Sequence, residues 1–273
     1  AVSQLRLWKA RDIQNFNMSL FTQGQYTRAL EESTNAEIIS KVLYPSDNHT
    51  EGKLLRLSQQ YFLVSASVQS IVRDHMAVYG RLDNLHEKVA IHINDTHPAL
   101  CIPELMRILI DENGLKWDDA WEITRRSTGY PTHTILPEAL EKWPVAMMEK
   151  LLPRHLQIIY EINGRFLNHI AKKYPGDMSR IQRMSLIDET GERYVRMANM
   201  CIVGSSSVNG VAELHTQILK DSLFSDFYRI WPERFRNVTN GITPRRWLML
   251  ANPSLSALLD ESIGQGWRKD TME

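Results

Sequence analysis

The sequence predicts an α/β protein in which a mostly parallel sheet is flanked by many long helices. Three short strand-like stretches, "KVAIHIN" at 88–94, "STGYPTHT" at 127–134 and "SVNGVA" at 207–212, are separated by helical patterns. Strands that alternate with helices indicate β-α-β units, whose strands run parallel in an open sheet. The chain has 273 residues, which is long enough to bury a large core.

Two helical patterns dominate the first part of the chain. The stretch "GQYTRALEESTNAEIISKVL" at 24–43 is apolar at both ends but polar in its middle, so we expect it to project from the body or to pack against a partner. A longer helix is predicted over 52–76. Its apolar side comprises Leu54, Leu57, Tyr61, Val64, Val68 and Ile71.

The remaining helices follow or precede the strand-like stretches. The spacing of apolar residues predicts a helix near 98–111, which Asp95 or Thr96 would cap. Further helices are predicted over 117–124, over 151–177 with Pro153 in the first turn, before the strand at 207–212, and after it.

Composition excludes several classes of partner. Lys plus Arg equals Asp plus Glu at 32 each, which speaks against a nucleic-acid or acidic-membrane partner and favours a neutral small molecule. Only Cys101 and Cys201 are present, so a disulfide framework is excluded and a reducing, cytoplasmic compartment is expected. Apolar runs are too short to span a membrane. The first and last residues have the patterns of interior elements, and we expect the chain to be a piece of a longer protein.

Three polar clusters follow strand-like segments: "NDTHP" at 94–98, "THT" at 132–134 and "TNGITPRRW" at 239–247. Ligands of open α/β sheets bind beyond the carboxyl ends of the strands. Neutral sugars need carboxylates, amides and imidazoles on fixed backbone, and these clusters supply them. The alternative interpretation is local, with Asp95 and Thr96 capping a helix, Asn240 in a turn, and His133 as an ordinary polar residue.

Other chemistry fits the sequence less well. His92 and His97 lack a third ligand nearby, so no metal site is predicted. The stretch "GSSSVNG" at 204–210 lacks both the Lys-Ser/Thr of a P-loop and the glycine spacing of a dinucleotide-binding motif, and we interpret it as a turn between a helix and a strand.

Taken together, these residues resemble the α-glucan phosphorylases, the family of glycogen, starch and maltodextrin phosphorylases. The matching strings are collinear and cover essentially the whole chain. They are "LRLW" at 5, "KVLYPSDN" at 41, "RLSQQYF" at 56, "NDTHP" at 94, "HTILPEALEKWPV" at 133, "LLPRHLQIIYEIN" at 151, "VNGVAELH" at 208 and "NVTNGITPRRW" at 237.

The resemblance implies a retaining glycosyltransferase of the GT-B type, with two Rossmann-like domains facing across a cleft. Such an enzyme cleaves the terminal α-1,4-linked glucose of a glucan with orthophosphate and releases glucose 1-phosphate. Its cofactor is pyridoxal 5′-phosphate, whose attachment lysine lies outside this chain. Residues 1–239 would be the later half of the first domain and 240–273 the start of the second, so the chain alone is expected to be inactive.

The same resemblance assigns roles to particular residues. His133 would be catalytic, with its backbone carbonyl beside the anomeric carbon and its ring on the sugar's 6-hydroxyl. Asp47 and Asn48 would lie on a mobile loop that gates the site. Asp95 and His97 would line the pocket on the β face of the sugar.

Farther along the chain, Asn240 would hold the terminal glucose with His133, and Trp247 would pack near the cofactor with Arg245 and Arg246 beside it. The parent enzyme would be a homodimer that pairs through the helix at 24–43. We expect Asp47, Asp95, His97, His133 and Asn240 to converge on one glucose ring.

Two departures from the family pattern stand near the expected site. The family usually has Ala-Tyr-Thr-Asn-His-Thr where this chain has residues 129–134 as Gly-Tyr-Pro-Thr-His-Thr, so Pro131 removes a backbone donor and Thr132 replaces an amide. Ser206 stands where a His is common. Two rival functions are a non-catalytic glucan-binding module and a nucleotide-sugar glucosyltransferase of similar build.

Overall fold

The computed structural model describes residues 3–13 and 16–270. The chain divides into two compact units, Ala1–Asn237 and Val238–Glu273. All of the strands described below lie in the first unit.

The main sheet of the first unit is parallel throughout, as predicted. It has four strands in the order β1-β2-β6-β7. Their registers pair Ile91 with Thr128, Gly129 with Ser207, and Val208 with Phe235. The strands are shorter than the sequence patterns suggested. They are β1 (Ile91–His92), β2 (Thr128–Pro131), β6 (Ser207–Gly210) and β7 (Phe235–Asn237).

A second, antiparallel sheet was not predicted. Its three strands run in the order β3-β5-β4, with Trp143 opposite Val195 and Ile187 opposite Val195 on the other side. These strands are two or three residues long, too short for an alternating pattern to show in the sequence. They are β3 (Lys142–Pro144), β4 (Ile187–Asp188) and β5 (Tyr194–Arg196).

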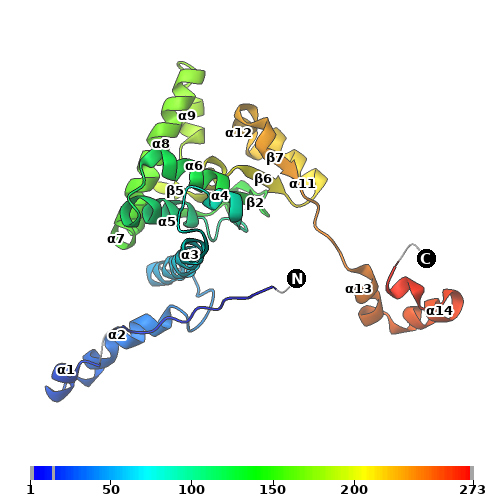
Figure 1. Cartoon of the computed structure of the whole chain (residues 1–273), viewed down its shortest axis with the longest axis horizontal. Helices are drawn as coiled ribbons and strands as arrows, with labels where there is room; N and C mark the ends of the chain where they lie inside the picture. Colours follow the sequence, from blue (N-terminus) through cyan, green and yellow to red (C-terminus); the bar gives the residue numbers. More distant parts are fainter. Residues whose placement is uncertain (1–2, 14–15, 271–273) are drawn as a thin grey trace. The chain divides into compact units, whose positions relative to one another are not determined.

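Helices pack around the main sheet, and α5 lies against α8 near the centre of the unit (Figure 1). Every residue of α10 is buried, and all of them except Asn199 are apolar. On the long helix α3, Leu57, Val64 and Val68 are buried as predicted, whereas Leu54 and Ile71 are only partly buried. The central helices are α3 (Thr50–Tyr79), α5 (Cys101–Arg107), α6 (Trp117–Ser127), α8 (Pro153–Lys173) and α10 (Met197–Gly204).

The helix predicted over 24–43 is shorter than expected. It is α2 (Tyr26–Ile38), preceded by the single-turn helix α1 (Met18–Thr22). Helical conformation ends at Ile38, and Tyr44 lies in the left-handed region with φ of 55°. Val42 and Leu43, which the pattern placed on a helix, are exposed in the segment that leads to α3.

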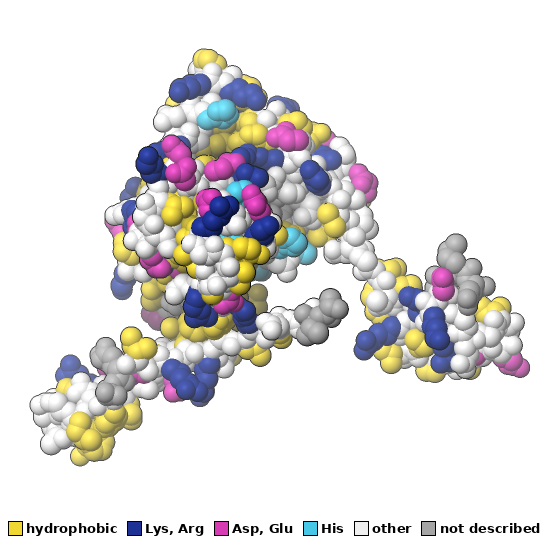
Figure 2. Space-filling model, viewed as in Figure 1, with side chains coloured by type: hydrophobic (Ala, Val, Ile, Leu, Met, Phe, Trp, Pro, Cys, Tyr) yellow, Lys and Arg dark blue, Asp and Glu magenta, His cyan; other side chains and the backbone are white. Residues whose placement is uncertain are grey.

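The remaining helices are α4 (Leu85–Lys88), α7 (Val145–Leu151), α9 (Met178–Met184), α11 (Glu213–Ile218), α12 (Ser225–Ile230), α13 (Pro244–Ala251) and α14 (Pro253–Ile263). Short 3-10 or π turns are η1 (Ile108–Glu112), η2 (Pro137–Ala139), η3 (Leu219–Leu223), η4 (Pro232–Arg234) and η5 (Gly266–Arg268). Basic and acidic side chains are interspersed over the visible face of the first unit (Figure 2). In the described ranges, none of the helices has the length and apolar character needed to cross a bilayer.

Candidate active site

The first two polar clusters meet at the carboxyl ends of β1 and β2. The backbone N–H of Asp95 donates to the carbonyl of Pro131 at 2.9 Å, so the pairing of the two strands continues beyond β1. Nε2 of His133 lies 2.7 Å from Oδ1 of Asn94, and the hydroxyl of Thr134 donates to Oδ2 of Asp95 at 3.1 Å. Segments 39 residues apart in the sequence are thereby joined by their side chains.

Asp95 has an unusual backbone conformation. Its φ of 60° lies in the left-handed region, which Asp and Asn tolerate better than most residues. Its Oδ1 accepts from the backbone N–H of Thr96 at 2.8 Å. The prediction that Asp95 or Thr96 caps the next helix is wrong, because α5 begins after Leu100 and the two side chains have other partners, Thr134 for Asp95 and Glu141 for Thr96. A strained backbone of this kind is common at functional sites.

A cavity of about 290 Å³ opens beside this edge. Asp47, Asp95 and His97 line it, although Asp47 comes from the loop before α3 and the other two follow β1. Asn48 and His133 are exposed and are not part of this lining. Three of the residues selected from the sequence therefore share one cavity.

The loop that carries Asp47 is held from two sides. Arg56 of α3 pairs with Asp47 at 2.8 Å, and its guanidinium lies 5.3 Å from the centroid of the Tyr44 ring. The Tyr44 ring in turn stands edge-on to the His97 ring, with 6.1 Å between centroids. These contacts connect the loop to the segment that follows β1.

The start of α3 approaches the same loop closely. Nδ1 of His49 accepts from the backbone N–H of Gly52 at 2.9 Å and caps the helix. A Cβ atom at position 52 would lie 1.8 Å from the carbonyl oxygen of Ser46. Only glycine fits at this position without a movement of the backbone.

Glu141 also lines the cavity and was not selected from the sequence. Its Oε1 accepts from the amide of Gln60 at 2.8 Å, and its Oε2 accepts from the hydroxyl of Thr96 at 3.1 Å. The carboxylate thus joins α3 to the turn that carries Asp95. Its partners are 81 and 45 residues away in the sequence, so no local pattern could have identified it.

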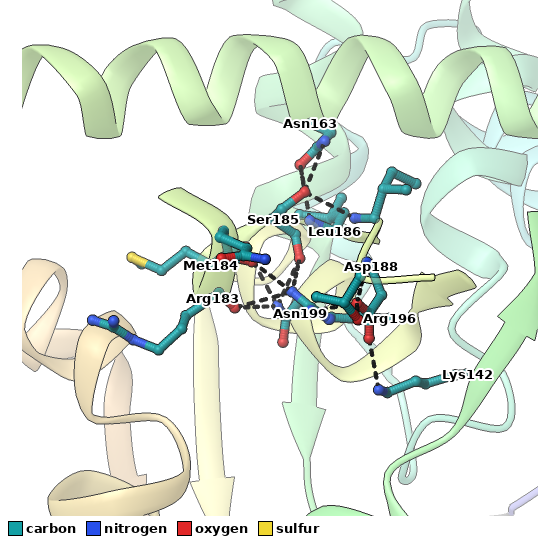
Figure 3. Close-up of polar contacts among 12 residues, drawn as sticks. Lys142, Asn163, Arg183, Met184, Ser185, Leu186, Asp188, Arg196 and Asn199 are labelled. Carbon is teal, nitrogen blue, oxygen red and sulfur yellow. Dashed lines mark hydrogen bonds and ion pairs between the residues drawn. The ribbon is translucent and has the colours of Figure 1, made fainter. Parts of the chain in front are cut away.

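A polar network behind the cavity fixes the wall that contains Lys142 (Figure 3). Asp188 of β4 accepts from Lys142 at 2.8 Å and pairs with Arg196 at 3.0 Å. The hydrogen bond from Lys142, opposed by desolvation, holds the pKa of Asp188 well below its ordinary value. The carboxylate therefore stays ionised and connects all three strands of the antiparallel sheet.

The same network reaches α8. Oδ1 of Asn163 accepts from the backbone N–H of Leu186 at 2.8 Å, and the amide of Asn199 donates to the carbonyl of Ser185 at 2.9 Å (Figure 3). Asn163 and Asn199 are buried. The segment before β4 is therefore attached to two core helices, α8 and α10, which gives the cavity wall a rigid support.

His215 on α11, the helix that follows β6, is a further residue that sequence reasoning passed over. Its Nδ1 accepts from the backbone N–H of Val211 at 3.4 Å, and Gly210 allows this approach because a Cβ there would lie 2.6 Å from Nδ1. Burial is the main cause that lowers the pKa of His215, while the nearby His133 acts in both directions, its charge lowering the pKa and its backbone raising it by a hydrogen bond. The string "VNGVAELH" contained this residue, but nothing in its spacing indicated that it faces His133.

Two of the selected residues lie in the second unit. Asn240 precedes α13 and is exposed, and Trp247 on α13 is 55% exposed. The convergence of Asn240 on the residues of the first unit, and the packing of Trp247 near the cofactor, stay predictions.

The cavity can bind a neutral polyhydroxylated ligand. Asp47, Asp95 and Glu141 provide acceptors, Lys142 provides donors, and His97 can serve as either. In residues 3–13 and 16–270 there is no group of three His, Cys, Asp or Glu side chains placed to hold a metal ion. The arrangement suits hydroxyl recognition.

Comparisons with known proteins agree with this chemistry. The family model described as carbohydrate phosphorylase matches residues 1–273. The chain is 54% identical over 270 residues to a glycogen phosphorylase of Haemophilus influenzae and 49% identical over 271 residues to one of Synechocystis. It is 51% identical over 277 residues to the brain form of the Rattus norvegicus enzyme. The matches cover 98–99% of this chain but only 32–33% of these relatives, so it spans about a third of their length.

Proposed function

The chain belongs to the carbohydrate phosphorylase family, and we propose that it forms one wall of the active site of an α-glucan phosphorylase. The proposed reaction transfers the terminal α-1,4-linked glucose of glycogen or maltodextrin to orthophosphate with retention and yields glucose 1-phosphate. The observation that carries this proposal is the cavity shared by Asp47, Asp95 and His97 at the carboxyl edge of the parallel sheet.

The side chains around the cavity are already ordered for sugar binding. Each oxygen of Asp95 accepts one hydrogen bond from the protein, from Thr96 and from Thr134. A carboxylate has about four lone-pair sites, so acceptor positions remain for sugar hydroxyls. Ligand groups that are fixed before binding lose less entropy when the sugar arrives.

His133 is the residue of this chain that we propose acts at the reacting carbon. Cleavage of a glycosidic bond passes through an oxocarbenium-like state, and a carbonyl oxygen beside the anomeric carbon stabilises the developing positive charge. The backbone carbonyl of His133 would supply that oxygen. Its ring, held by Asn94 at 2.7 Å, would bind the 6-hydroxyl and set the position of the residue.

The loop around Asp47 and Asn48 would exclude water when it closes over the sugar. Arg56 and Tyr44 hold it in the present arrangement. Removal of water strengthens every polar contact in the site, which is the advantage of a gating loop here. Glu141, through Thr96 and Gln60, would keep the opposite wall in place during closure.

Pyridoxal 5′-phosphate, when bound, would supply a phosphate group that relays a proton to and from orthophosphate. In this chain the residues that fit it are Trp247, whose indole ring is more than half exposed, and the adjacent Arg245 and Arg246. An exposed indole face suits the packing of a flat ring. We place the attachment lysine outside these 273 residues.

The finer assignments belong to the same proposal. The parent enzyme would be a cytoplasmic GT-B protein, with residues 1–239 in its first domain and 240–273 in its second. Its homodimer contact would use α2, on which Tyr26, Leu30 and Ile38 are exposed.

A chimaera tests the proposed function. This chain would replace the matching third of the Haemophilus influenzae enzyme, and glucose 1-phosphate would be measured with maltoheptaose and phosphate. We expect phosphate-dependent release that falls at least 100-fold in Asp95→Asn, while the surface control Asp83→Asn keeps the parent rate.

Other outcomes would reject the proposal. Glucosyl transfer from ADP-glucose without phosphate would point to a nucleotide-sugar glucosyltransferase. Binding of maltoheptaose by a folded chimaera that releases no glucose 1-phosphate would point to a glucan-binding module.

A further inference from the structure

The ring of His215 lies beside His133, the residue that we place at the reacting carbon. His215 is on α11, the helix that follows β6 (Figure 1). Strand β6 is the neighbour of β2, and beyond β2 the backbone N–H of Thr132 donates to the carbonyl of Asn209 at 2.9 Å. This bond continues the pairing of the two strands, so His133 and the start of α11 meet at the same end of the sheet.

One nitrogen of the His215 ring is fixed by the turn that precedes α11. Nδ1 accepts from the backbone N–H of Val211 at 3.4 Å, so it carries no proton, and in the neutral ring the proton is on Nε2. A Cβ at Gly210 would lie 2.6 Å from Nδ1 and 2.5 Å from the hydroxyl of Thr216, so glycine makes this approach possible. The Thr216 hydroxyl also donates to Oδ1 of Asn237 at 2.9 Å, which attaches α11 to the end of β7. The position and the tautomer of the ring are therefore set by its surroundings.

The other nitrogen, Nε2, is buried, and among the residues that the structure describes it has no hydrogen-bond partner of ordinary geometry. A buried donor without a partner is costly. The backbone of His133 is placed to supply one, since it acts on the His215 ring and raises the pKa of that ring. A hydrogen bond raises the pKa of a histidine when the ring donates, because donation favours the protonated form. The group of His133 that faces Nε2 is therefore its carbonyl and not its N–H.

The surroundings of His215 favour the neutral ring. Burial is the first cause that lowers the pKa of His215 from its ordinary value of 6.5, and the charge of His133 lowers it as well. The hydrogen bond with the His133 backbone and the charge of Asp95 act in the opposite direction and do not prevail. A neutral imidazole can donate from Nε2 without placing a cation beside the positive charge that develops on the sugar.

We propose that His215 is a positioning residue of the phosphorolysis, whose Nε2–H donates to the backbone carbonyl of His133 and fixes the direction in which that oxygen faces the anomeric carbon. This inference rests on the proposed function. A carbonyl oxygen has two lone pairs, so one can accept from the imidazole while the other faces the sugar. Hydrogen bonds of an active site are often long before the substrate binds and shorten in the complex. The effect is greatest in the transition state, because the charge that the carbonyl stabilises develops there.

Two amide substitutions in the chimaera separate positioning from packing. In His215→Gln the amide nitrogen can occupy the place of Nε2, whereas in His215→Asn the shorter side chain reaches only the place of Nδ1. We expect His215→Asn to lower kcat about tenfold, as for the loss of one hydrogen bond, with KM for maltoheptaose and for phosphate unchanged. We expect His215→Gln to keep kcat within about threefold of the parent. His169→Asn and His169→Gln, at an exposed position of α8, are the matched controls and should both be neutral.

NMR of the 273-residue chain, with its histidines labelled with ¹⁵N, tests the contact without any need for activity. The signals of the His215 ring are those missing from His215→Gln. At a pH where the ring is neutral, we expect Nδ1 to be unprotonated and the Nε2 proton to exchange slowly with water, because that proton is buried and hydrogen-bonded.

Circular dichroism establishes that each variant is folded, and the NMR measurement decides the matter if His215→Asn is not. Equal kcat in His215→Asn and His215→Gln would overturn the proposal, and so would a ring proton on Nδ1. A raised KM with unchanged kcat would also overturn it, since His215 would then act on substrate binding. A parent chimaera that releases no glucose 1-phosphate would contradict the proposed function instead, and exchange of the Nε2 proton would still test the contact.

Discussion

Nε2 of His133 lies 2.7 Å from Oδ1 of Asn94, so the residue proposed to act at the reacting carbon is positioned by a residue of the segment that follows the neighbouring strand β1. Asn94→Ala should free the imidazole without changing the core. We expect kcat/KM of the chimaera to fall about tenfold, the value of one hydrogen bond of about 1.4 kcal/mol. Asn168→Ala, on the exposed side of α8, is the control and should be neutral. An unchanged rate in Asn94→Ala would mean that the contact has no positioning role.

The ion pair between Asp47 and Arg56 predicts how the gating loop behaves. Both side chains are partly exposed, so Arg56→Met should cost no more than about 1 kcal/mol in the free energy of unfolding. Hydrogen exchange at residues 44–48 should nevertheless become faster, because the loop loses its attachment to α3. Exchange rates equal to those of the parent chain would show that other contacts hold the loop.

The close packing around Gly52 leads us to expect that one added methyl group lowers the free energy of unfolding substantially. In Gly52→Ala, the Cβ would lie 1.8 Å from the carbonyl oxygen of Ser46, and the backbone must move to accommodate it. Urea unfolding should show a loss of about 1–3 kcal/mol. Gly164→Ala on α8 is the matched control, since a Cβ there meets nothing within 4 Å, and it should stabilise the helix by about 0.5–1 kcal/mol. Similar results for both would contradict the close approach.

The buried Glu104 on α5 should make the free energy of unfolding depend on pH in the acid range. Burial would raise its pKa, but hydrogen bonds from His155, Arg107 and Ser65 prevail and lower it from 4.5 to about 2. The unfolded chain therefore takes up this proton at a higher pH than the native one. The stabilisation is fully present above about pH 4.5 and is lost as the pH falls toward 2.

Glu104→Gln should therefore cost about 3–5 kcal/mol at pH 7, because it breaks a buried charge cluster. The difference from the parent chain should be smaller at pH 3. Urea unfolding at both pH values measures this, with the exposed Glu87→Gln as the control. A difference that does not change with pH would contradict the ionised state of Glu104.

Local sequence patterns could predict the helices whose apolar residues recur at helical spacing and the parallel strands that alternate with them. Leu57, Val64 and Val68 recur at helical spacing, and they are buried on α3 as expected. The antiparallel sheet could not be predicted, because its strands are only two or three residues long and because β3 pairs with a segment far along the chain, Lys142 lying opposite Arg196. The end of α2 at Ile38 was missed because the apolar residues Val42 and Leu43 continue the helical spacing beyond the residue at which the helix ends.

In the candidate site, too, some residues could be selected from local sequence patterns and others could not. Asp95 and His97 could be selected because they directly follow a strand, where ligands of α/β sheets gather. Glu141 could not, because its partners Gln60 and Thr96 are brought to it only by the tertiary fold. Pro131, which the sequence marked as a disturbance, ends β2, and its carbonyl still accepts from Asp95, so the pairing continues across it.

The left-handed backbone at Asp95 has a consequence for how substitutions there should be interpreted. Replacement by Ala removes the carboxylate and replacement by Glu moves it. Either replacement also introduces a residue that disfavours the left-handed backbone, at a cost of roughly 1–2 kcal/mol. Asn separates the two because it keeps the tolerance for positive φ and loses only the charge. The residues acceptable at this position are thus restricted to a short set by geometry alone, before any ligand is considered.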